Sequence, residues 1–242
     1  PRRAHPHGLC KVRLTSTARV CDGRSYDVGE WPRTKQTAAS ASISDVGLAI
    51  IGGAVRAYLE RHDELPDQSL AVTIPISLRP KGAGVMDGND VAMMSASLCT
   101  DVADPLARLE AVQKSTASSK LRKEAMGART LTDISQQLPG RLIGLGIRSL
   151  PDVSRMFSVL PGLPLTVTNV PGSPVPIYLA GARMHRMFGL GPVLHGRGAI
   201  HVVSSYNGQA SISVTASRDA LLDLPSVGDA LARPFPGMTP AA

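Results

Sequence analysis

The sequence is poor in aromatic residues, in cysteine and in long hydrophobic runs. Aromatic residues make up 3% of the 242 positions, which is too few for base stacking on single-stranded nucleic acid as a main activity. No apolar run approaches the 18 or so residues that a membrane-spanning helix requires. The chain is nevertheless of globular composition, because hydrophobic residues make up 43% of it.

Cysteine usage indicates the compartment. The three cysteines (Cys10, Cys21 and Cys99) show no CxxC spacing, which argues against a disulfide framework and a zinc site and favours a reducing, cytoplasmic compartment. No apolar core of a signal peptide stands at the N-terminus, and the missing initial methionine favours a fragment or a processed chain. The histidines form no HExxH or HxxxH pair, so we expect no bound metal.

Charge is unevenly distributed along the chain. Residues 1–35 hold eight lysine and arginine residues against three acids, and so supply +5 of the formal net charge of +7. Such a segment is either simply solvated or touches an anionic surface, such as a membrane or a lipid inclusion. It carries no nucleic-acid-binding motif and few aromatic residues, so we expect no nucleic-acid partner.

Helix and strand patterns alternate along the chain. Helices are predicted from Ser42 and from Asp104 and over 131–138, 151–160 and 226–232, and strands over 25–31, 70–78, 91–100, 165–169, 182–188, 200–206 and 210–216. Asn207-Gly208, between the last two strands, is a strong hairpin signal. The pattern predicts an α/β fold with a mixed sheet flanked by helices. We divide the chain into a basic, partly ordered segment (1–40), a domain (41–232) and a tail (233–242).

Individual residues sharpen these predictions. Ser42, with Asp45 three residues later, has the pattern of a helix N-cap. Gly52 and Gly53 interrupt that helix at a cost of about 1 kcal/mol each relative to alanine, which indicates that another element approaches closely. Pro75 favours an edge strand or a bulge, because proline donates no hydrogen bond to a sheet.

The stretch LTVTNVPGSPVPIYLAGARM, residues 165–184, drives a β-branched strand into a corner rich in proline. Asn169 ends the predicted strand, and Pro171 and Gly172 follow it, with two further prolines beyond. Such a segment has few conformations available. Its rigidity serves either to end a strand or to hold a backbone at a site.

No catalytic constellation is complete in the sequence. It has no GxSxG nucleophile elbow and no phosphate-binding loop, and its glycine-rich residues 189–198 lack the context of a dinucleotide fingerprint. His195 and His201 are each either a general base or a hydrogen-bonded histidine of a strand. The residues alone therefore assign no catalytic group, with these two histidines as weak candidates.

Five blocks, in order, resemble the C-terminal half of the bacterial wax ester synthase/diacylglycerol acyltransferase (WS/DGAT) family. They are ISDVGLAIIGGAVRAYL (43–59), ELPDQSLAVTIPISLRP (64–80), DVADPLARLEAVQKSTASSK (101–120), VTNVPGSPVPIYLAGARM (167–184) and SSYNGQASISVTASRD (204–219). The fourth block is similar to the family's Asn-Val-Pro-Gly motif. The resemblance covers residues 26–224.

This resemblance implies a chloramphenicol-acetyltransferase-like fold, in which two related α/β halves enclose a tunnel. It implies an O-acyltransferase that moves a fatty acyl group from acyl-CoA, the co-substrate, to diacylglycerol or a long-chain alcohol, with no bound cofactor. In the family, the N-terminal half carries an HHxxxDG motif whose second histidine acts as general base. The implied partner is that N-terminal half, in cis or in trans.

The sequence departs from the family where this base would stand. HHxxxDG is absent: Thr17-Ala18 stands at the histidine positions before Asp22-Gly23, and Gly82-Ala83 before Asp87-Gly88. The chain therefore resembles a C-terminal half without its catalytic partner. One function is an acyltransferase domain that works with that partner. The alternative is a non-catalytic remnant that binds lipid or protein, which predicts a large exposed apolar face.

Two motifs of the resemblance are candidate sites. The candidates for the wall of the substrate tunnel are Thr168, Asn169, Val170, Pro171 and Gly172. Their alternative role is a purely structural corner. Ser44 and Asp45, where the family usually has Asn before Asp, are either the start of a helix or a contact with substrate.

Overall fold

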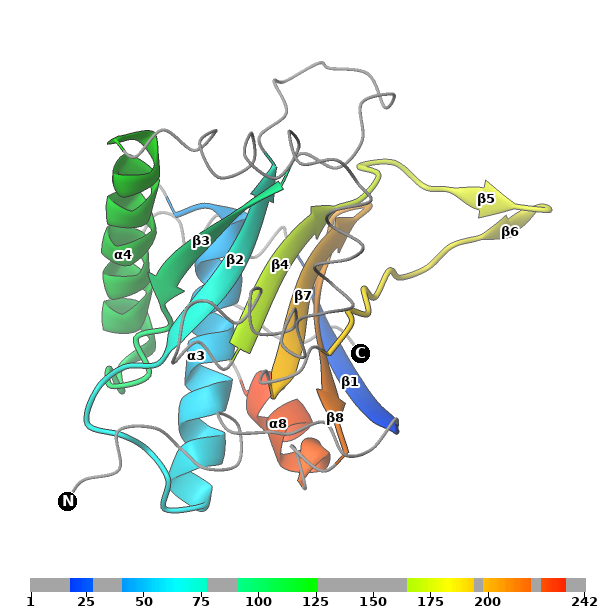
Figure 1. Cartoon of the computed structure of the whole chain (residues 1–242). Coiled ribbons are helices and arrows are strands. Elements are labelled where there is room, and N and C mark those ends of the chain that lie inside the picture. Colours follow the sequence, from blue (N-terminus) through cyan, green and yellow to red (C-terminus); the bar gives the residue numbers. More distant parts are fainter. Residues whose placement is uncertain are drawn as a thin grey trace, which may run out of the picture.

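The computed structural model describes residues 18–27, 41–77, 91–125, 165–193, 198–218 and 223–233. In this part of the chain, a six-stranded sheet packs against a layer of helices (Figure 1). The helices are α3 (Ile43–Arg61), α4 (Pro105–Ala125) and α8 (Leu224–Leu231). The strands of the sheet are β1 (Arg19–Asp27), β2 (Ala71–Ser77), β3 (Val91–Ser97), β4 (Leu165–Pro171), β7 (Ala199–Tyr206) and β8 (Gln209–Ser217).

The sheet is mixed, with the strand order β1-β8-β7-β4-β2-β3. Strand β4 runs parallel to both of its neighbours, β7 and β2, whereas the other neighbouring strands pair antiparallel. The predicted α/β class with a mixed sheet and flanking helices is thereby confirmed. Strand β1 comes from the basic N-terminal segment and pairs with β8 over its whole length, so this segment contributes an edge strand to the domain.

Helix α3 begins as the sequence predicts. The Ser42 hydroxyl accepts a hydrogen bond from the Asp45 backbone N–H, and the Asp45 carboxylate accepts one from the Ser42 N–H, which makes a capping box. Gly52 and Gly53 are the point of close approach. A β-carbon on Gly52 would collide with the carbonyl oxygen of Leu98, and one on Gly53 would lie 2.5 Å from Arg108 Nη2. The glycine pair therefore lets the start of α4 and the end of β3 pack directly on α3.

The hairpin between β7 and β8 also forms as predicted. Asn207 and Gly208 both have positive φ angles, 45° and 78°, as two-residue hairpin turns of this kind require. The strand near 25–31 is found earlier, as β1. The strand predicted over 182–188 is wrong: only Ala182–Arg183 (β6) pair, with Tyr178–Leu179 (β5), in a separate two-stranded hairpin. The helices predicted over 131–138 and 151–160 lie outside the described residues.

Pro75 sits in β2, which is not an edge strand, because β4 and β3 flank it. The pairing of β2 with β4 is confined to Val72 and Thr73. At Pro75 the strand pairs only with β3. The prediction of an edge position is therefore wrong for the strand as a whole, but it fits the local situation, since no β4 ladder exists at Pro75 for proline to interrupt.

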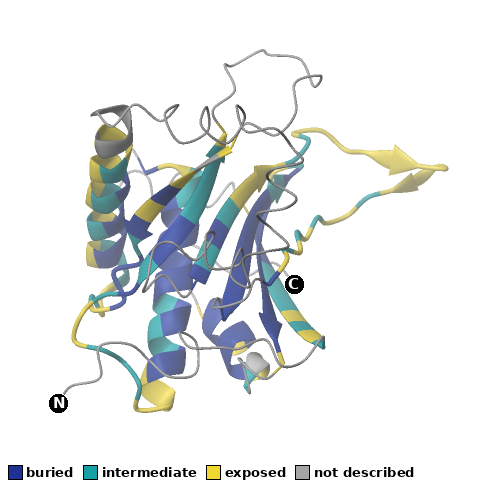
Figure 2. Cartoon of the chain, viewed as in Figure 1, coloured by how far each residue is buried: buried dark blue, intermediate teal, exposed yellow. Residues whose placement is uncertain are grey.

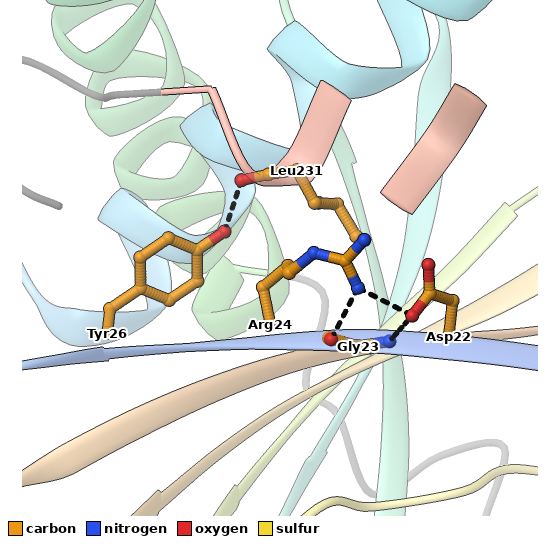
Figure 3. A network of polar contacts seen from close by, with 5 residues as sticks. All are labelled: Asp22, Gly23, Arg24, Tyr26 and Leu231. Carbon is orange, nitrogen blue, oxygen red and sulfur yellow. Dashed lines mark hydrogen bonds and ion pairs between the residues drawn. The ribbon is translucent and has the colours of Figure 1, made fainter. Parts of the chain in front are cut away.

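Strand β1 is tied to α8 through side chains that point to the same face (Figure 3). The Tyr26 hydroxyl donates a 2.5 Å hydrogen bond to the Leu231 carbonyl, and burial raises the pKa of Tyr26. Arg24 Nη1 lies 2.6 Å from Asp22 Oδ1, which also accepts from the Gly23 N–H. Asp22-Gly23 is therefore part of a regular strand and of the surface by which that strand contacts α8.

Burial follows this layered arrangement (Figure 2). The inner strands β7 and β8 and the sheet-facing side of α3 are buried, whereas the β5–β6 hairpin projects away from the sheet and is exposed. No helix among the described residues is both long enough and apolar enough to cross a membrane.

Candidate functional site

The candidate site lies where β2 and β4 separate. These neighbouring strands pair only near the start of each, at Val72 and Thr73 of β2. Further along, β2 pairs with β3 alone and β4 with β7. A cavity of about 230 Å³ opens beside the diverging strands and is bounded by the N-terminal end of α3 and by α4. Its lining includes Ser44, Asp45, Ile74, Thr116, Lys120 and Asn169.

Asn169 and Ser44 meet at this cavity. Asn169 Nδ2 donates a 2.9 Å hydrogen bond to Ser44 Oγ in an exposed position. Ser44 follows the N-cap of α3, and Asn169 lies near the end of β4. The two candidate motifs, which the sequence places far apart, therefore form one polar site.

Asp45 is the buried residue that holds the site in place. The residue is only 7% exposed, and its Oδ2 accepts hydrogen bonds from the Ser42 N–H (2.9 Å) and the Ser42 hydroxyl (2.7 Å). Its Oδ1 accepts from the Thr116 hydroxyl of α4, at 2.9 Å. Both oxygens are thus engaged within the protein, so this carboxylate fixes the start of α3 against α4.

The other candidate residues in and beside the Asn-Val-Pro-Gly motif have other structural roles. Val167 and Asn169 line the cavity, so the alternation of a strand directs Thr168 and Val170 to the opposite face of the sheet. Strand β4 continues to Pro171 instead of ending at Asn169. The Gly172 N–H donates to the Ser205 carbonyl of β7 at 2.8 Å, and a β-carbon there would collide with that same oxygen.

Beyond Gly172, the chain leaves the sheet as a long arm, residues 173–187, which carries the β5–β6 hairpin (Figure 1). Tyr206 of β7 holds the base of the arm. Its hydroxyl accepts from the Ile177 N–H at 2.8 Å and donates to the Met184 carbonyl at 2.9 Å. The arm is apolar at its tip, where Leu179 is 81% exposed and Tyr178 is also exposed. The proline corner is therefore followed by an exposed apolar arm whose base is fixed by Tyr206.

His201 lies outside this cavity. It stands on β7, is 2% exposed, and neither ring nitrogen has a hydrogen-bond partner among the described residues. Its neighbours around a small apolar space include Val55, Tyr58 and Leu165. Burial lowers the pKa of His201 from 6.5 to about 4. This environment favours a neutral strand histidine over a general base, although without the hydrogen bonds expected of one. His195 lies outside the described residues.

Two residues that line the cavity were not predicted from the sequence. Thr116 and Lys120 both come from α4 and stand one helical turn apart. Their four-residue spacing is the signal that they share a face, but which face meets the cavity depends on how α4 packs against α3. No histidine lines the cavity within the described part of the chain. That part also holds no cluster of three or more metal-ligating side chains.

The fold defines the class of protein: the described residues have the architecture of one half of a chloramphenicol-acetyltransferase-like fold. The wax ester synthase/diacylglycerol acyltransferase from Marinobacter aquaeolei VT8 superimposes on 95% of this chain and 50% of its own, with a TM-score of 0.68 at 22% identity. A condensation domain from the enacyloxin polyketide synthase matches 93% of this chain with a TM-score of 0.52 at 13% identity.

The chain belongs to the WS/DGAT family, because the family model of the WS/DGAT C-terminal domain matches residues 87–238. Rv3480c from Mycobacterium tuberculosis, whose name assigns it provisionally as a diacylglycerol O-acyltransferase, is 35% identical over 89% of this chain and 42% of its own length. The O-acyltransferase WSD from Acinetobacter baylyi is 31% identical over 89% of this chain and 45% of its own. The chain spans less than half the length of these relatives.

Proposed function

We propose that this chain is the C-terminal half of an O-acyltransferase that moves a fatty acyl group from acyl-CoA to diacylglycerol or a long-chain alcohol. The observation that carries the proposal is the Asn169–Ser44 pair at a cavity between two diverging strands, in a member of the WS/DGAT family. Relatives of this chain bear the names diacylglycerol O-acyltransferase and O-acyltransferase.

In this proposal the site positions the substrate and does not take its proton. The acceptor hydroxyl attacks the thioester carbonyl, a base removes the hydroxyl proton, and CoA leaves as the thiol after taking up a proton. Ser44 Oγ accepts from Asn169, so the hydroxyl hydrogen of Ser44 and the second N–H of Asn169 Nδ2 remain as donors. Such donors stabilise negative charge that develops on a carbonyl oxygen.

We place the base elsewhere in the assembled enzyme. HHxxxDG is absent from the sequence, and the ring of His201 is buried in apolar surroundings. We assign the base to an N-terminal family half, joined in cis or in trans. Acyl-CoA serves as co-substrate, and the proposal needs no resident cofactor.

The arm supports a partner of this kind. Its apolar side chains are Val175, Ile177, Tyr178 and Leu179, all exposed, and an exposed apolar segment of this size marks an interaction site. We place the N-terminal half on it. We infer a cytoplasmic site of action from the cysteine usage. We place it at the surface of a membrane or lipid inclusion, because both acceptor substrates are lipids.

Transfer of labelled palmitoyl from palmitoyl-CoA tests the proposal. The full chain is assayed alone and together with a separately expressed N-terminal half of a WS/DGAT relative, with diacylglycerol and hexadecanol as acceptors. We expect product only in the mixture, and at least tenfold less with the variant Asn169→Ala. Equal product from the chain alone would show that it carries its own base and would refute the division of labour.

The exposed arm also favours a second candidate, a non-catalytic module that binds lipid or another protein. This candidate predicts no product from the chain alone or from the mixture. It predicts that the chain still binds a fluorescent fatty acid. Palmitoyl transfer in the mixture therefore separates the two functions.

A further inference from the structure

A second cavity lies toward the other end of α3, where the start of α4 and the end of α8 meet it. Its volume is about 300 Å³, and it shares no lining residue with the Asn169 cavity. This volume is at the lower limit of ordinary small-molecule sites, which measure about 300–1,000 Å³. Its charged lining residues are Arg56, Glu60, Arg108 and Arg233.

Arg108 is the unusual member of this group. It is only 5% exposed, and no carboxylate lies within ion-pair distance of it among the described residues. Its Nε donates to the Ala49 carbonyl at 2.9 Å, and its Nη1 donates to the carbonyls of Val102 (2.9 Å) and Ala103 (3.2 Å). Nη2 takes part in none of these bonds. A buried guanidinium without a counter-ion is costly, so an anion in this cavity would be stabilised.

The charges around Arg108 also favour an anion in this cavity. Burial, and then the nearby Arg56, lower the pKa of Arg108, while Asp104 raises it to a smaller extent. Among the described residues that line the cavity, three are arginines and one, Glu60, is a carboxylate. Pro105, the first residue of α4, also lines the cavity. Because the Asp104 carboxylate already caps this helix end, accepting from the Ala107 N–H at 2.8 Å, the positive charge at the cavity comes from the arginine side chains.

The other two arginines differ in how far they are engaged. Arg56 Nη2 lies 2.6 Å from Glu60 Oε1, and its Nη1 donates to the carbonyls of Thr100 (2.8 Å) and Asp101 (3.0 Å). Arg233 is exposed and stands at the rim. Arg56 is thus fixed by the protein, whereas Arg233 is available to close over a bound group.

We propose that this cavity binds a phosphate monoester through Arg108, Arg56 and Arg233. Guanidinium groups match the geometry of phosphate oxygens and bind them through paired, charge-assisted hydrogen bonds. The volume suits a phosphorylated small group and is too small for a lipid tail as well. The phosphate belongs either to a soluble ester or to the headgroup of a membrane lipid. The site is separate from the Asn169 cavity and does not depend on acyl transfer.

Two binding measurements on the full chain, both at constant ionic strength, test whether this site binds a phosphate monoester. Calorimetry with glycerol 3-phosphate detects a soluble source. Flotation with phosphatidylcholine vesicles, with and without phosphatidic acid, detects a membrane source. We expect binding in at least one of the two measurements, weakened about tenfold by Arg233→Gln, since this change removes a charge-assisted hydrogen bond.

Two further variants protect the test against loss of folding. Arg108 also ties α3 to residues 102–103, so its removal endangers the fold and is not the main readout. Glu60→Gln removes the one lining carboxylate, and we expect it to strengthen binding roughly threefold. Arg61→Gln is the matched control, because Arg61 is exposed and pairs with Asp223 outside the cavity. No binding in either measurement, or equal losses in the Arg233 and Arg61 variants, would overturn the proposal.

Discussion

The side-chain amide of Asn169 donates a 2.9 Å hydrogen bond to the hydroxyl of Ser44, which lies 125 residues earlier in the chain. This bond links the end of β4 to the start of α3 at the rim of a cavity. It is exposed, so water can replace it when either partner is removed. Its importance should therefore be greater for function than for stability.

Substitution of this pair should separate the two effects. We expect Asn169→Ala and Ser44→Ala each to change the free energy of unfolding by less than about 1 kcal/mol, since an exposed neutral hydrogen bond contributes little. In the assembled enzyme, each should lower palmitoyl transfer about tenfold, and the double variant should lose little more. Urea denaturation and the palmitoyl assay provide the two readouts. Fully additive losses in activity would contradict a joint role.

Asp45 should behave in the opposite way. Removing its carboxylate by Asp45→Ala abolishes the capping box and breaks the bond from the Thr116 hydroxyl, which keeps only the Gln113 carbonyl, at 3.1 Å, as an acceptor among the described residues. We expect a loss of about 3 kcal/mol in the free energy of unfolding, from a cap of about 1 kcal/mol and a hydrogen bond to a buried charged group.

The matched control for Asp45 is Thr116→Val, which keeps the cap and removes one bond. It should cost about 1 kcal/mol by urea denaturation. If Thr116→Val were as stable as the unchanged chain, the link between α3 and α4 through Asp45 would have no energetic weight.

His201 should make the domain sensitive to acid. Its pKa in the folded chain, about 4, lies below the ordinary value of 6.5, so between these pH values the unfolded chain binds a proton that the folded chain does not. The stability present above pH 6.5 should fall by roughly 3 kcal/mol as the pH approaches 4. His201→Leu should flatten this dependence and stabilise the fold at pH 7, because both ring nitrogens are buried without a hydrogen-bond partner among the residues that the structure describes. Urea denaturation from pH 4 to pH 8 measures both effects. An unchanged pH profile would assign the acid sensitivity to other groups.

The arm provides a test of the partner. Leu179 is 81% exposed, so Leu179→Asp should leave the stability of this chain unchanged within about 0.5 kcal/mol. We expect it to weaken association with the N-terminal half at least tenfold, as measured by co-purification and calorimetry. Val91→Asp, on the exposed end of the edge strand β3, is the control for a general loss of apolar surface. Equal weakening by both changes would remove the arm from the interface.

Local signals in the sequence account for much of the fold. The Ser42–Asp45 capping box, the Asp104-Pro105 helix start and the Asn207-Gly208 turn each act over a few residues, and all three appear in the structure. The glycine pair in α3 also indicated a close approach. The strand predicted over 182–188 failed, because residues past the proline corner form an arm that is held on β7 at its base, through Tyr206 and Ser204, and is exposed beyond it.

The sequence by itself determined most of the described elements, the mixed α/β class and the two motifs, because capping, turn formation and side-chain periodicity are local properties of the chain. Only the tertiary structure decided that Asn169 meets Ser44, that β2 leaves β4 after Thr73, and that Arg108 is buried with no carboxylate of the described ranges in ion-pair distance. These relationships depend on strand order and on the packing of α4 against α3. Both are set by burial of the shared core, and no residue pattern along the chain records them.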